Sequence, residues 1–429
     1  MMQFFKLAFK NLFHRPLNLA LSLILFALGV GLISFLLLFN AQVKEKFEAN
    51  LAGIDLVIGA KGSPLQLILC NMYHIDNPTG NIKIKDAKAF LNPRHPLLKK
   101  SVPLSLGDNY RSFRIVGTNH DILSLYGGQI KEGSLWKKDL EVTIGATVAR
   151  KAGLKIGDAF VSSHGFDEDP DLAHDHAKFK VSGILKGTGT VLDQLILTNT
   201  ASIWEMHTHA EAAAEDHEDH DHIHAAADTL DPHVHDNSNL DLLAHPEEQI
   251  TSILVQYKSV SKYQALNMPR AINENTSMQA ASPAYEINKL YDMIGTGTET
   301  IRYIALLIAV VSLISIFISL YQSMKQRKYE LALLRVMGSS RAGLFLLILI
   351  EGLGIAFLGW LCGMVLSHVG MSILGNYLTE DFGYDFQAWV LLEEEWYLFF
   401  ISLALGAVAA LVPAWKAANT DINQTLGEK

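Results

Sequence analysis

PLNLALSLILFALGVGLISFLLLFNAQV, residues 16–43, contains no charged side chain. About 20 apolar residues, rising about 1.5 Å each, cross a hydrocarbon core of about 30 Å, so this stretch can span a membrane as a helix. Its apolar part is longer than that of a secretory signal peptide, and no small-x-small cleavage site follows it. The stretch therefore predicts a retained transmembrane helix.

Three more apolar runs follow. Residues 303–324 and 396–415 carry no charge, and residues 342–377 carry only Glu351. A carboxylate near the centre of a bilayer costs about 2.5 to 3.5 kcal/mol, so Glu351 needs a partner, a proton or an interfacial position. We interpret it, and His368 near the other end of the same run, as residues of helix packing rather than of a proton relay. The runs predict an α-helical integral membrane protein with four transmembrane helices.

The charges beside the runs predict their orientation. Basic residues without acids precede the first run, and basic residues outnumber acids in the loop after the second. The loop before the fourth run carries only acids. Both termini are therefore predicted to be cytoplasmic, in a multi-pass protein of the cell's inner (cytoplasmic) membrane. The net charge of −9 does not suggest nucleic-acid binding.

The long segment between the first two runs is predicted to be a mixed α/β extracytoplasmic domain. Short apolar runs bounded by Gly, Asn or charged residues are typical of strands, and TVARKAGL (147–154) has a helical pattern. The predicted strands are DLVIGA (55–60), FRIVGT (113–118), FKVSGIL (179–185), QLILTN (194–199) and SILVQYK (252–258). Cys70 and Cys362 fall in different compartments, which excludes a disulfide between them.

Apolar stripes extend beyond two of the membrane runs. Val43, Phe47, Leu51 and Ile54 continue the first, and isoleucines at 287, 294, 301 and 308 lead into the second, so we expect helical stalks. The predicted segments are an amphipathic cytoplasmic helix (1–16), a first transmembrane helix continuing into a stalk (17–43), the extracytoplasmic domain (44–300), transmembrane helices at 301–324, 342–374 and 396–415, a cytoplasmic coupling loop or helix (325–341), an outer loop (375–395) and a cytoplasmic tail (416–429).

A low-complexity stretch interrupts the predicted domain. HTHAEAAAEDHEDHDHIHAAADTLDPHVHD, residues 207–236, holds eight of the seventeen histidines. Neutral imidazole binds Zn²⁺ and other transition metals, and neighbouring carboxylates attract cations. Because ligands are in excess and no apolar periodicity accompanies them, we interpret 207–248 as a flexible metal-capturing insertion, with a merely solvated tract as the alternative. The candidate ligands are His207, His209, His217, His220, His222, His224, His233 and His235.

Several segments resemble permeases of the FtsX/MacB-like family of ABC systems. The resemblance lies in LAFKNLFHRPLNLALSLILFALGVGL (7–32), MKQRKYELALLRVMGSSRAGLF (324–345) and VPAWKAANTDINQTL (412–426), and extends to TIGATVARKAGLKIGDAF (143–160) and FKVSGIL. The sequence departs from the family at Asp421-Ile422, where Asp-Pro is common, and at the histidine-rich insertion. The resemblance implies four spans with one large extracytoplasmic domain between the first two, as inferred above from the residues.

The resemblance also implies how such a protein works. A separate cytoplasmic ABC ATPase would drive movement of the extracytoplasmic domain, and no GxxxxGK[ST] loop occurs in this chain, so we do not expect it to be an enzyme. A homodimer, or a heterodimer with a related permease, is expected, with a periplasmic protein or lipoprotein as a further candidate partner and no required cofactor. The implied ATPase contacts are Lys328, Glu330, Leu331, Leu334, Arg335, Met337 and Gly338.

Two other functions stay open. The histidines suit a zinc- or metal-linked system, but they equally suit a membrane-anchored extracytoplasmic metal-binding or sensor protein without transport. An outward-facing metallohydrolase is the third alternative, although no HExxH motif is present.

Overall fold

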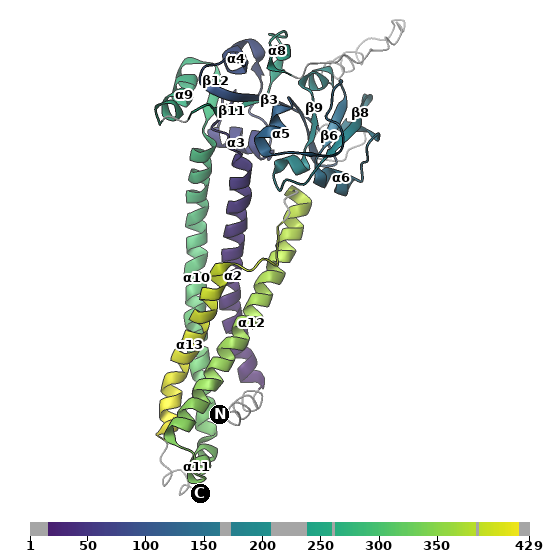
Figure 1. Ribbon diagram of the computed structural model, residues 1–429. Coiled ribbons are helices and arrows are strands. Elements are labelled where there is room, and N and C mark those ends of the chain that lie inside the picture. The colour runs from purple at the N-terminus through teal and green to yellow at the C-terminus, as the bar shows by residue number, and fades with distance from the viewer. Residues whose placement is uncertain (1–15, 164–172, 207–237, 260–261, 383–385, 420–429) are drawn as a thin grey trace, which may run out of the picture. The chain divides into compact units, whose positions relative to one another are not determined.

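The computed structural model describes residues 16–163, 173–206, 238–259, 262–382 and 386–419. The chain forms two compact units, which we call the helical unit (residues 1–44 and 292–429) and the α/β unit (residues 45–291). Helices α2 (Pro16–Leu51) and α10 (Pro283–Gln326) each begin in one unit and end in the other (Figure 1). The predicted helix at 1–16 and most of the predicted tail lie outside the described residues.

The helical unit contains the four membrane helices that the sequence predicts. Besides the membrane parts of α2 and α10, it comprises α11 (Lys328–Val336), α12 (Arg341–Phe382) and α13 (Glu393–Ala418). The stretches long and apolar enough to span a membrane are Leu19–Leu51, Glu299–Gln326, Arg341–Tyr377 and Glu393–Ala418. The chain is thus a multi-pass membrane protein.

Small residues bring these helices into close contact. A Cβ atom added to Gly406 of α13 would lie 2.4 Å from the Cβ of Ala356 in α12, and one added to Gly352 would lie 3.0 Å from the carbonyl oxygen of Gly406. Between α2 and α12, a Cβ added to Gly31 would lie 2.9 Å from the carbonyl oxygen of Gly363. Such close backbone approach is how membrane helices gain van der Waals contact where lipid removes the hydrophobic driving force.

Buried polar side chains add hydrogen bonds between α2, α12 and the first turn of α13. Ser34 of α2 donates to Oε1 of Glu395 at 2.7 Å, and its hydroxyl oxygen lies 2.9 Å from that of Ser367 in α12. The backbone N–H of Leu392 donates to the other carboxylate oxygen of Glu395 at 3.1 Å and so closes the first turn of α13. His368 is also buried, with its ring 5.6 Å from that of Trp389, which agrees with the packing role expected from the sequence.

The α/β unit is built on one mixed sheet of ten strands, in the order β12-β1-β11-β3-β4-β9-β6-β8-β5, with β7 paired to β3 and β8. Its strands are β1 (Leu56–Ala60), β3 (Leu98–Tyr110), β4 (Phe113–Thr118), β5 (Ile130–Gly133), β6 (Glu141–Ile144), β7 (Ala159–Ser163), β8 (Ala173–Leu185), β9 (Ile196–Thr198), β11 (Ser252–Tyr257) and β12 (Met278–Ala281). A small second sheet pairs β2 (Ile82–Lys83) with β10 (Gln249–Ile250).

Helical segments join these strands. They are α3 (Pro64–Met72), α4 (Ile84–Leu91), α5 (Asp121–Tyr126), α6 (Ala146–Ala152), the 3₁₀ turn η2 (Val191–Gln194), residues 200–206, α8 (Asn239–Leu242) and α9 (Lys262–Asn275). The five predicted strands and the predicted helix around α6 are all confirmed.

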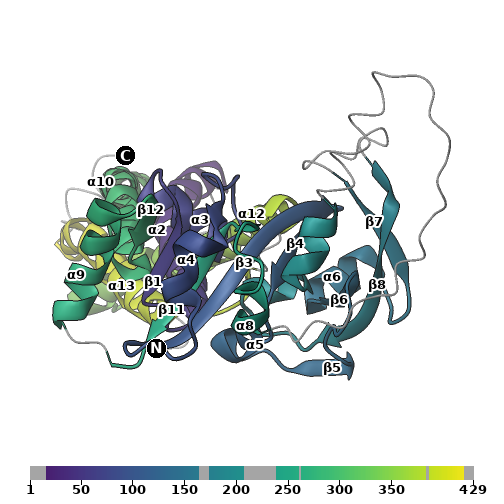
Figure 2. The same cartoon turned by 90° about the horizontal axis from the view of Figure 1, so that it is seen from above.

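Two core clusters divide the α/β unit into halves. The first half contains β12, β1, β11 and most of β3, and its core includes Leu56, Ile253 and Met278. The second half contains β4, β9, β6, β8 and β5, and its core includes Ile115 and Phe179. Figure 2 shows the long strand β3 running between them, and its pairing with β4 shifts register between Leu106 and Asn109.

The predicted stalk stripes are only partly realised. Within the α/β unit, Phe47 of α2 lies edge-on to Tyr291 of α10, with ring centroids 5.9 Å apart, and Ile287 is buried. Further along α10, Ile301 and Ile304 are exposed. The apolar seam is therefore interrupted at these residues, whereas Ile308 of the same heptad series approaches α2, where its Cγ2 would lie 3.3 Å from a Cβ added to Gly29.

Candidate functional site

Helix α11 forms the short segment between α10 and α12 that the sequence identifies as the coupling segment. Glu330 in its first turn and Arg335 in its last complement the helix dipole. Gly338 ends it in a left-handed conformation, with φ of 101°, where its N–H bonds to the carbonyl of Arg335. A side chain at this position would strain the turn, which explains the glycine.

One face of α11 is committed to the helical unit itself. Leu331 and Ala332 are 0% exposed, and Leu331 packs with Leu344, Leu347 and Ile348 of α12. Leu334 packs against the same cluster, which also includes Ala414 and Ala417 near the end of α13. A movement of α11 would therefore reach the ends of α12 and α13 through direct contact.

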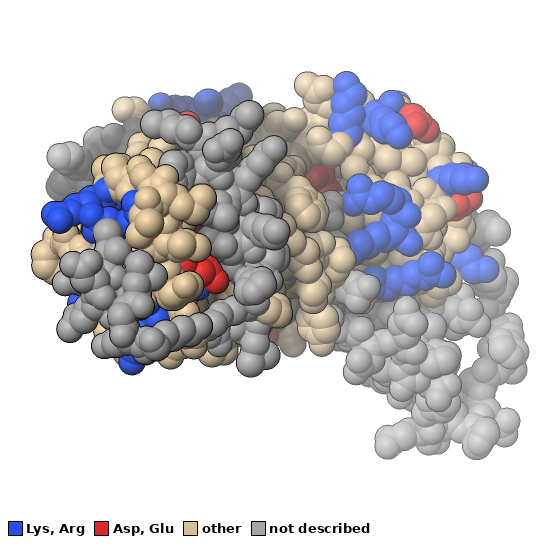
Figure 3. Space-filling model, turned by 90° about the horizontal axis from the view of Figure 1, so that it is seen from below, with Lys and Arg blue, Asp and Glu red and all other residues tan. Residues whose placement is uncertain are grey.

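The opposite face of α11 carries an exposed apolar edge. Leu333, Val336 and Met337 are exposed, Met337 to 76%, and Tyr329 lies exposed beside them. Lys328 and Glu330 are also exposed, while Arg335 is half-buried. Figure 3 shows Lys and Arg side chains at this end of the helical unit.

The structure places the predicted ATPase contacts on both sides of α11, and their role stays a prediction. Lys328, Glu330, Met337 and Gly338 are exposed, whereas Leu331 is buried and Leu334 packs against the cluster on α12. Tyr329 and Leu333 are absent from the predicted contacts, although both lie at helical spacing from Val336 on the exposed apolar edge.

An ion pair joins α11 to the membrane helix that follows it. Arg327, the residue before α11, places Nη1 at 3.0 Å from Oε1 of Glu351 in α12, and their side chains are 13% and 3% exposed. Nε of the same guanidinium lies 3.4 Å from the exposed carboxylate of Glu330. Arg327 is thus the partner that the isolated carboxylate in the third membrane run requires.

The histidine candidates cannot be placed in this way. His207, His209, His217, His220, His222, His224, His233 and His235 all lie outside the described residues. Within the described ranges, no group of three or more His, Cys, Asp or Glu side chains could hold a metal ion. The metal site therefore stays a prediction.

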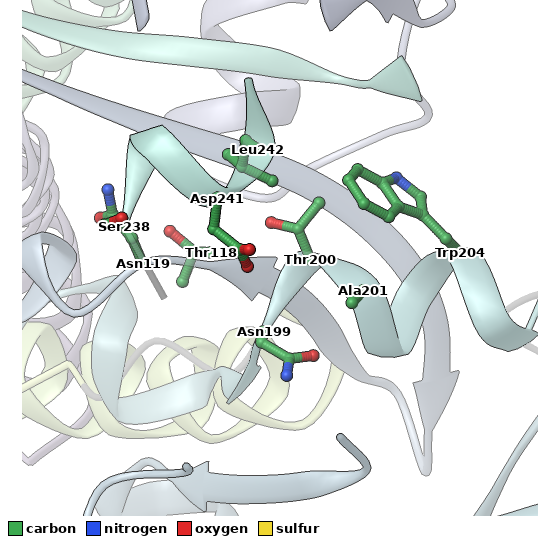
Figure 4. A pocket seen from close by; sticks show the side chains of 9 residues that line it. All are labelled: Thr118, Asn119, Asn199, Thr200, Ala201, Trp204, Ser238, Asp241 and Leu242. Carbon is green, nitrogen blue, oxygen red and sulfur yellow. The ribbon is translucent and has the colours of Figure 1, made fainter. Parts of the chain in front are cut away.

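The residues just before and just after this stretch both belong to the folded part of the α/β unit. Thr200, Ala201 and Trp204 from the preceding helix line the same pocket as Asp241 and Leu242 of α8, which follows the stretch (Figure 4). The indole N–H of Trp204 also donates to the carbonyl of Gln249 at 2.7 Å. The stretch follows a short helix as expected, but residues 239–242, which the predicted flexible insertion (207–248) includes, form α8 before the strand β11.

Another polar cluster of the α/β unit joins Arg114 of β4 to residues in and just after α3. Nη1 of the buried Arg114 contacts Sγ of Cys70 at 3.6 Å and the carbonyl of Asp76 at 3.0 Å. Burial raises the pKa of Cys70 to about 11 despite this guanidinium. Burial, and then the charge of Arg114, lowers the pKa of His74 to about 3. An unreactive thiol and a neutral imidazole indicate a structural cluster rather than a nucleophilic site.

Comparison with known proteins gives one family match, within the helical unit. Residues 302–422 match the family model described as FtsX-like permease C-terminal. No curated protein matches the chain.

Two solved structures are similar to part of the chain. The extracellular domain of the noncanonic ABC-type transporter YknZ from Gram-positive bacteria is 12% identical, with a TM-score of 0.28, over 53% of this chain and 99% of that one. A domain of a protein described as a permease from Porphyromonas gingivalis is 9% identical, with a TM-score of 0.25, over 53% of this chain and 86% of that one. Both scores are too low to argue from. The family match rests on the helical unit alone, where residues 302–422 are similar to the FtsX-like permease C-terminal family.

Proposed function

We propose that the protein is the permease subunit of an ABC transporter, in which a separate cytoplasmic ATPase docks on the exposed edge of α11. The observation that carries the proposal is the two-faced packing of α11. Leu331 and Leu334 pack it against α12 and α13, while Leu333, Val336 and Met337 are exposed. The match of residues 302–422 to FtsX-like permeases supports an ATPase as the occupant of that edge.

The proposal includes an orientation and an assembly. The basic residues around α11 support its placement on the cytoplasmic side, and the α/β unit would then lie outside the cytoplasm. Work done on α11 would pass through α12 and α13 and move the α/β unit. We propose a homodimer, or a heterodimer with a related permease, as the working form.

A docking experiment tests this function. Leu333→Glu together with Val336→Glu would place two carboxylates on the exposed edge, and Leu240→Glu, at an exposed leucine of α8, is the matched control. Losing two buried aliphatic side chains removes about 3 to 6 kcal/mol, so co-purification with the ATPase should be lost. The control should retain it. Equal co-purification of both variants would contradict docking on this edge.

A second function rests on the histidine-rich stretch. We propose that the transporter serves a system linked to zinc or another transition metal, which the insertion senses or captures. A membrane-anchored metal-binding or sensor protein without transport is the rival. Removal of the ATPase separates them, because the phenotype of the permease would disappear with the ATPase in the first case and persist in the second.

A further inference from the structure

The end of α2 inside the α/β unit carries a buried asparagine. Asn50 is 0% exposed, and its Nδ2 donates to the carbonyl of Lys46 one turn earlier at 3.0 Å. Its Oδ1 accepts the backbone N–H of Val191 at 2.8 Å, in a bond buried from solvent. The carboxamide is therefore held by its own helix and aimed at a segment far away in the sequence.

The segment that Asn50 holds is firmly joined to the second half of the unit. Val191 begins η2, and Asp193 of this turn accepts the N–H groups of Thr188 and Gly189, both at 2.8 Å. A Cβ atom added to Gly145 would lie 2.2 Å from the carbonyl of Leu192, so η2 is pressed against the residue that precedes α6. A displacement of Val191 would therefore be transmitted to β6 and α6 through these direct contacts.

The backbone of α2 leads instead into the first half. After Leu51 the chain turns through Ala52 and Gly53, whose φ angles are 46° and 68°, and enters β1. Asp55 donates its N–H to the carbonyl of Val255 in β11 at 2.9 Å. Thus α2 is joined to the first half covalently and to the second half through the Asn50 carboxamide.

We propose that Asn50 is a positioning residue that ties the second half of the α/β unit to α2, so that a displacement of this helix moves both halves together. The source of the displacement rests on the proposed function, since the ATPase would supply it. The tie itself is a property of the resting protein. It can be tested without an ATPase.

Asn71 provides a closely matched control. It is also buried, its Nδ2 donates to the carbonyl of Leu67 one turn earlier at 2.8 Å, and its Oδ1 accepts the hydroxyl of Ser252 at 2.7 Å. Both of its partners belong to the first half. Asn71→Leu therefore removes the same kind of bond as Asn50→Leu without touching the tie between α2 and the second half.

The experiment measures distances between spin labels in the full chain in nanodiscs. Labels at the exposed positions Glu45 and Lys178 report on α2 and the second half, and labels at Glu45 and Lys88 report on α2 and the first half. The exposed Cys362 is replaced by serine, while Cys70 stays because its thiol is buried.

Asn50→Leu should broaden or shift the distance between positions 45 and 178 and leave that between 45 and 88 unchanged. Asn71→Leu should leave the distance between 45 and 178 as it is. The Val191 amide should exchange with deuterium about tenfold faster in Asn50→Leu, the equivalent of about 1.4 kcal/mol for a lost hydrogen bond. Unchanged distances in Asn50→Leu, or the same change in Asn71→Leu, would overturn the proposal.

A rescue variant and the addition of ATP complete the test. Asn50→Asp keeps an acceptor for the Val191 N–H, and should restore the distance between positions 45 and 178. With the ATPase present, ATP should leave both distances unchanged in the unsubstituted chain, because both halves move with α2, and should change only the distance between 45 and 178 in Asn50→Leu. If ATP changes neither distance in Asn50→Leu, the proposed function fails, while the resting distances still decide the role of Asn50.

Discussion

Arg327 stands where three helices meet. Its backbone lies between α10 and α11, and its guanidinium reaches Glu351 in α12. Two charges removed from water attract each other strongly, yet their desolvation offsets much of that gain. The pair is therefore better understood as a geometric constraint than as a source of stability, because either charge alone would be left unpaired in a buried place.

Glu351→Gln should destabilise the protein by about 3 kcal/mol, since it leaves the Arg327 guanidinium buried without its counter-charge. Glu330→Gln is the matched control, because Glu330 contacts the same guanidinium but is 69% exposed, and it should cost less than about 1 kcal/mol. Thermal unfolding in one detergent measures both. If Arg327→Met combined with Glu351→Leu were less stable than either single variant, the constraint would be misassigned.

His74 should make the α/β unit sensitive to acid. Its pKa is lowered to about 3 in the folded chain, below the ordinary value of 6.5, so unfolding takes up a proton between these two values. Stability should be unaffected above about pH 6.5 and fall below it, by at most about 1.4 kcal/mol per pH unit.

The pH dependence of unfolding in His74→Asn tests this. Asparagine tolerates the left-handed conformation of this residue, whose φ is 55°, and it does not titrate. Subtracting the profile of the variant from that of the parent should leave a slope that begins near pH 6.5. Parallel profiles for His74→Asn and its parent would refute the assignment.

At the scale of elements, the sequence predicts which segments exist better than which way they face. The four membrane helices follow from runs of apolar residues, which is local information. In α11, apolar residues at 331, 333, 334 and 336 lie on both sides of the helix, so its period alone does not select the inner face. Contact with Leu344 and Ala414 selects it, and these contacts come from distant parts of the chain.

The sheet shows the same limit. Strand β1 pairs with β11 and β12, whose residues lie about 200 positions later, for example Ile58 opposite Ile253. Alternation and turn residues identify each strand but carry no information on such distant partners. The sequence does not identify the partner of Glu351 for a related reason, because Arg327 lies 24 residues away and outside the apolar run.

Identical substitutions at two glycines should separate tight helix packing from loose packing. Gly406→Ala would bring two Cβ atoms to 2.4 Å at the α12–α13 contact, so it should destabilise the protein by about 1 to 3 kcal/mol. Gly370→Ala meets only Phe35 at 3.7 Å, and should be neutral or stabilise by up to about 1 kcal/mol. Unfolding midpoints of the two variants should therefore move in opposite directions or differ clearly. Equal midpoints would mean that α12 and α13 do not pack this closely.

For the whole molecule, the histidine-rich stretch and the folded units should be separable. Replacing residues 207–237 by a short Gly/Ser linker should change the unfolding midpoint by less than about 2 °C, because the packing around Trp204 and α8 is built from the flanks. Bound Zn²⁺, measured by calorimetric titration, should be lost in the same variant. Retained zinc would remove the metal hypothesis, and a large fall in the midpoint would show that the α/β unit depends on the stretch.

The shared pocket of Trp204 and α8 also has a practical consequence. A loop that leaves and re-enters the folded unit tolerates an inserted domain better than a strand or a helix does. A fluorescent protein or a lanthanide-binding tag inserted between Met206 and Ser238 would report from the α/β unit of the full chain. The low-complexity, histidine-rich stretch is thus the most suitable place in the α/β unit to insert a reporter.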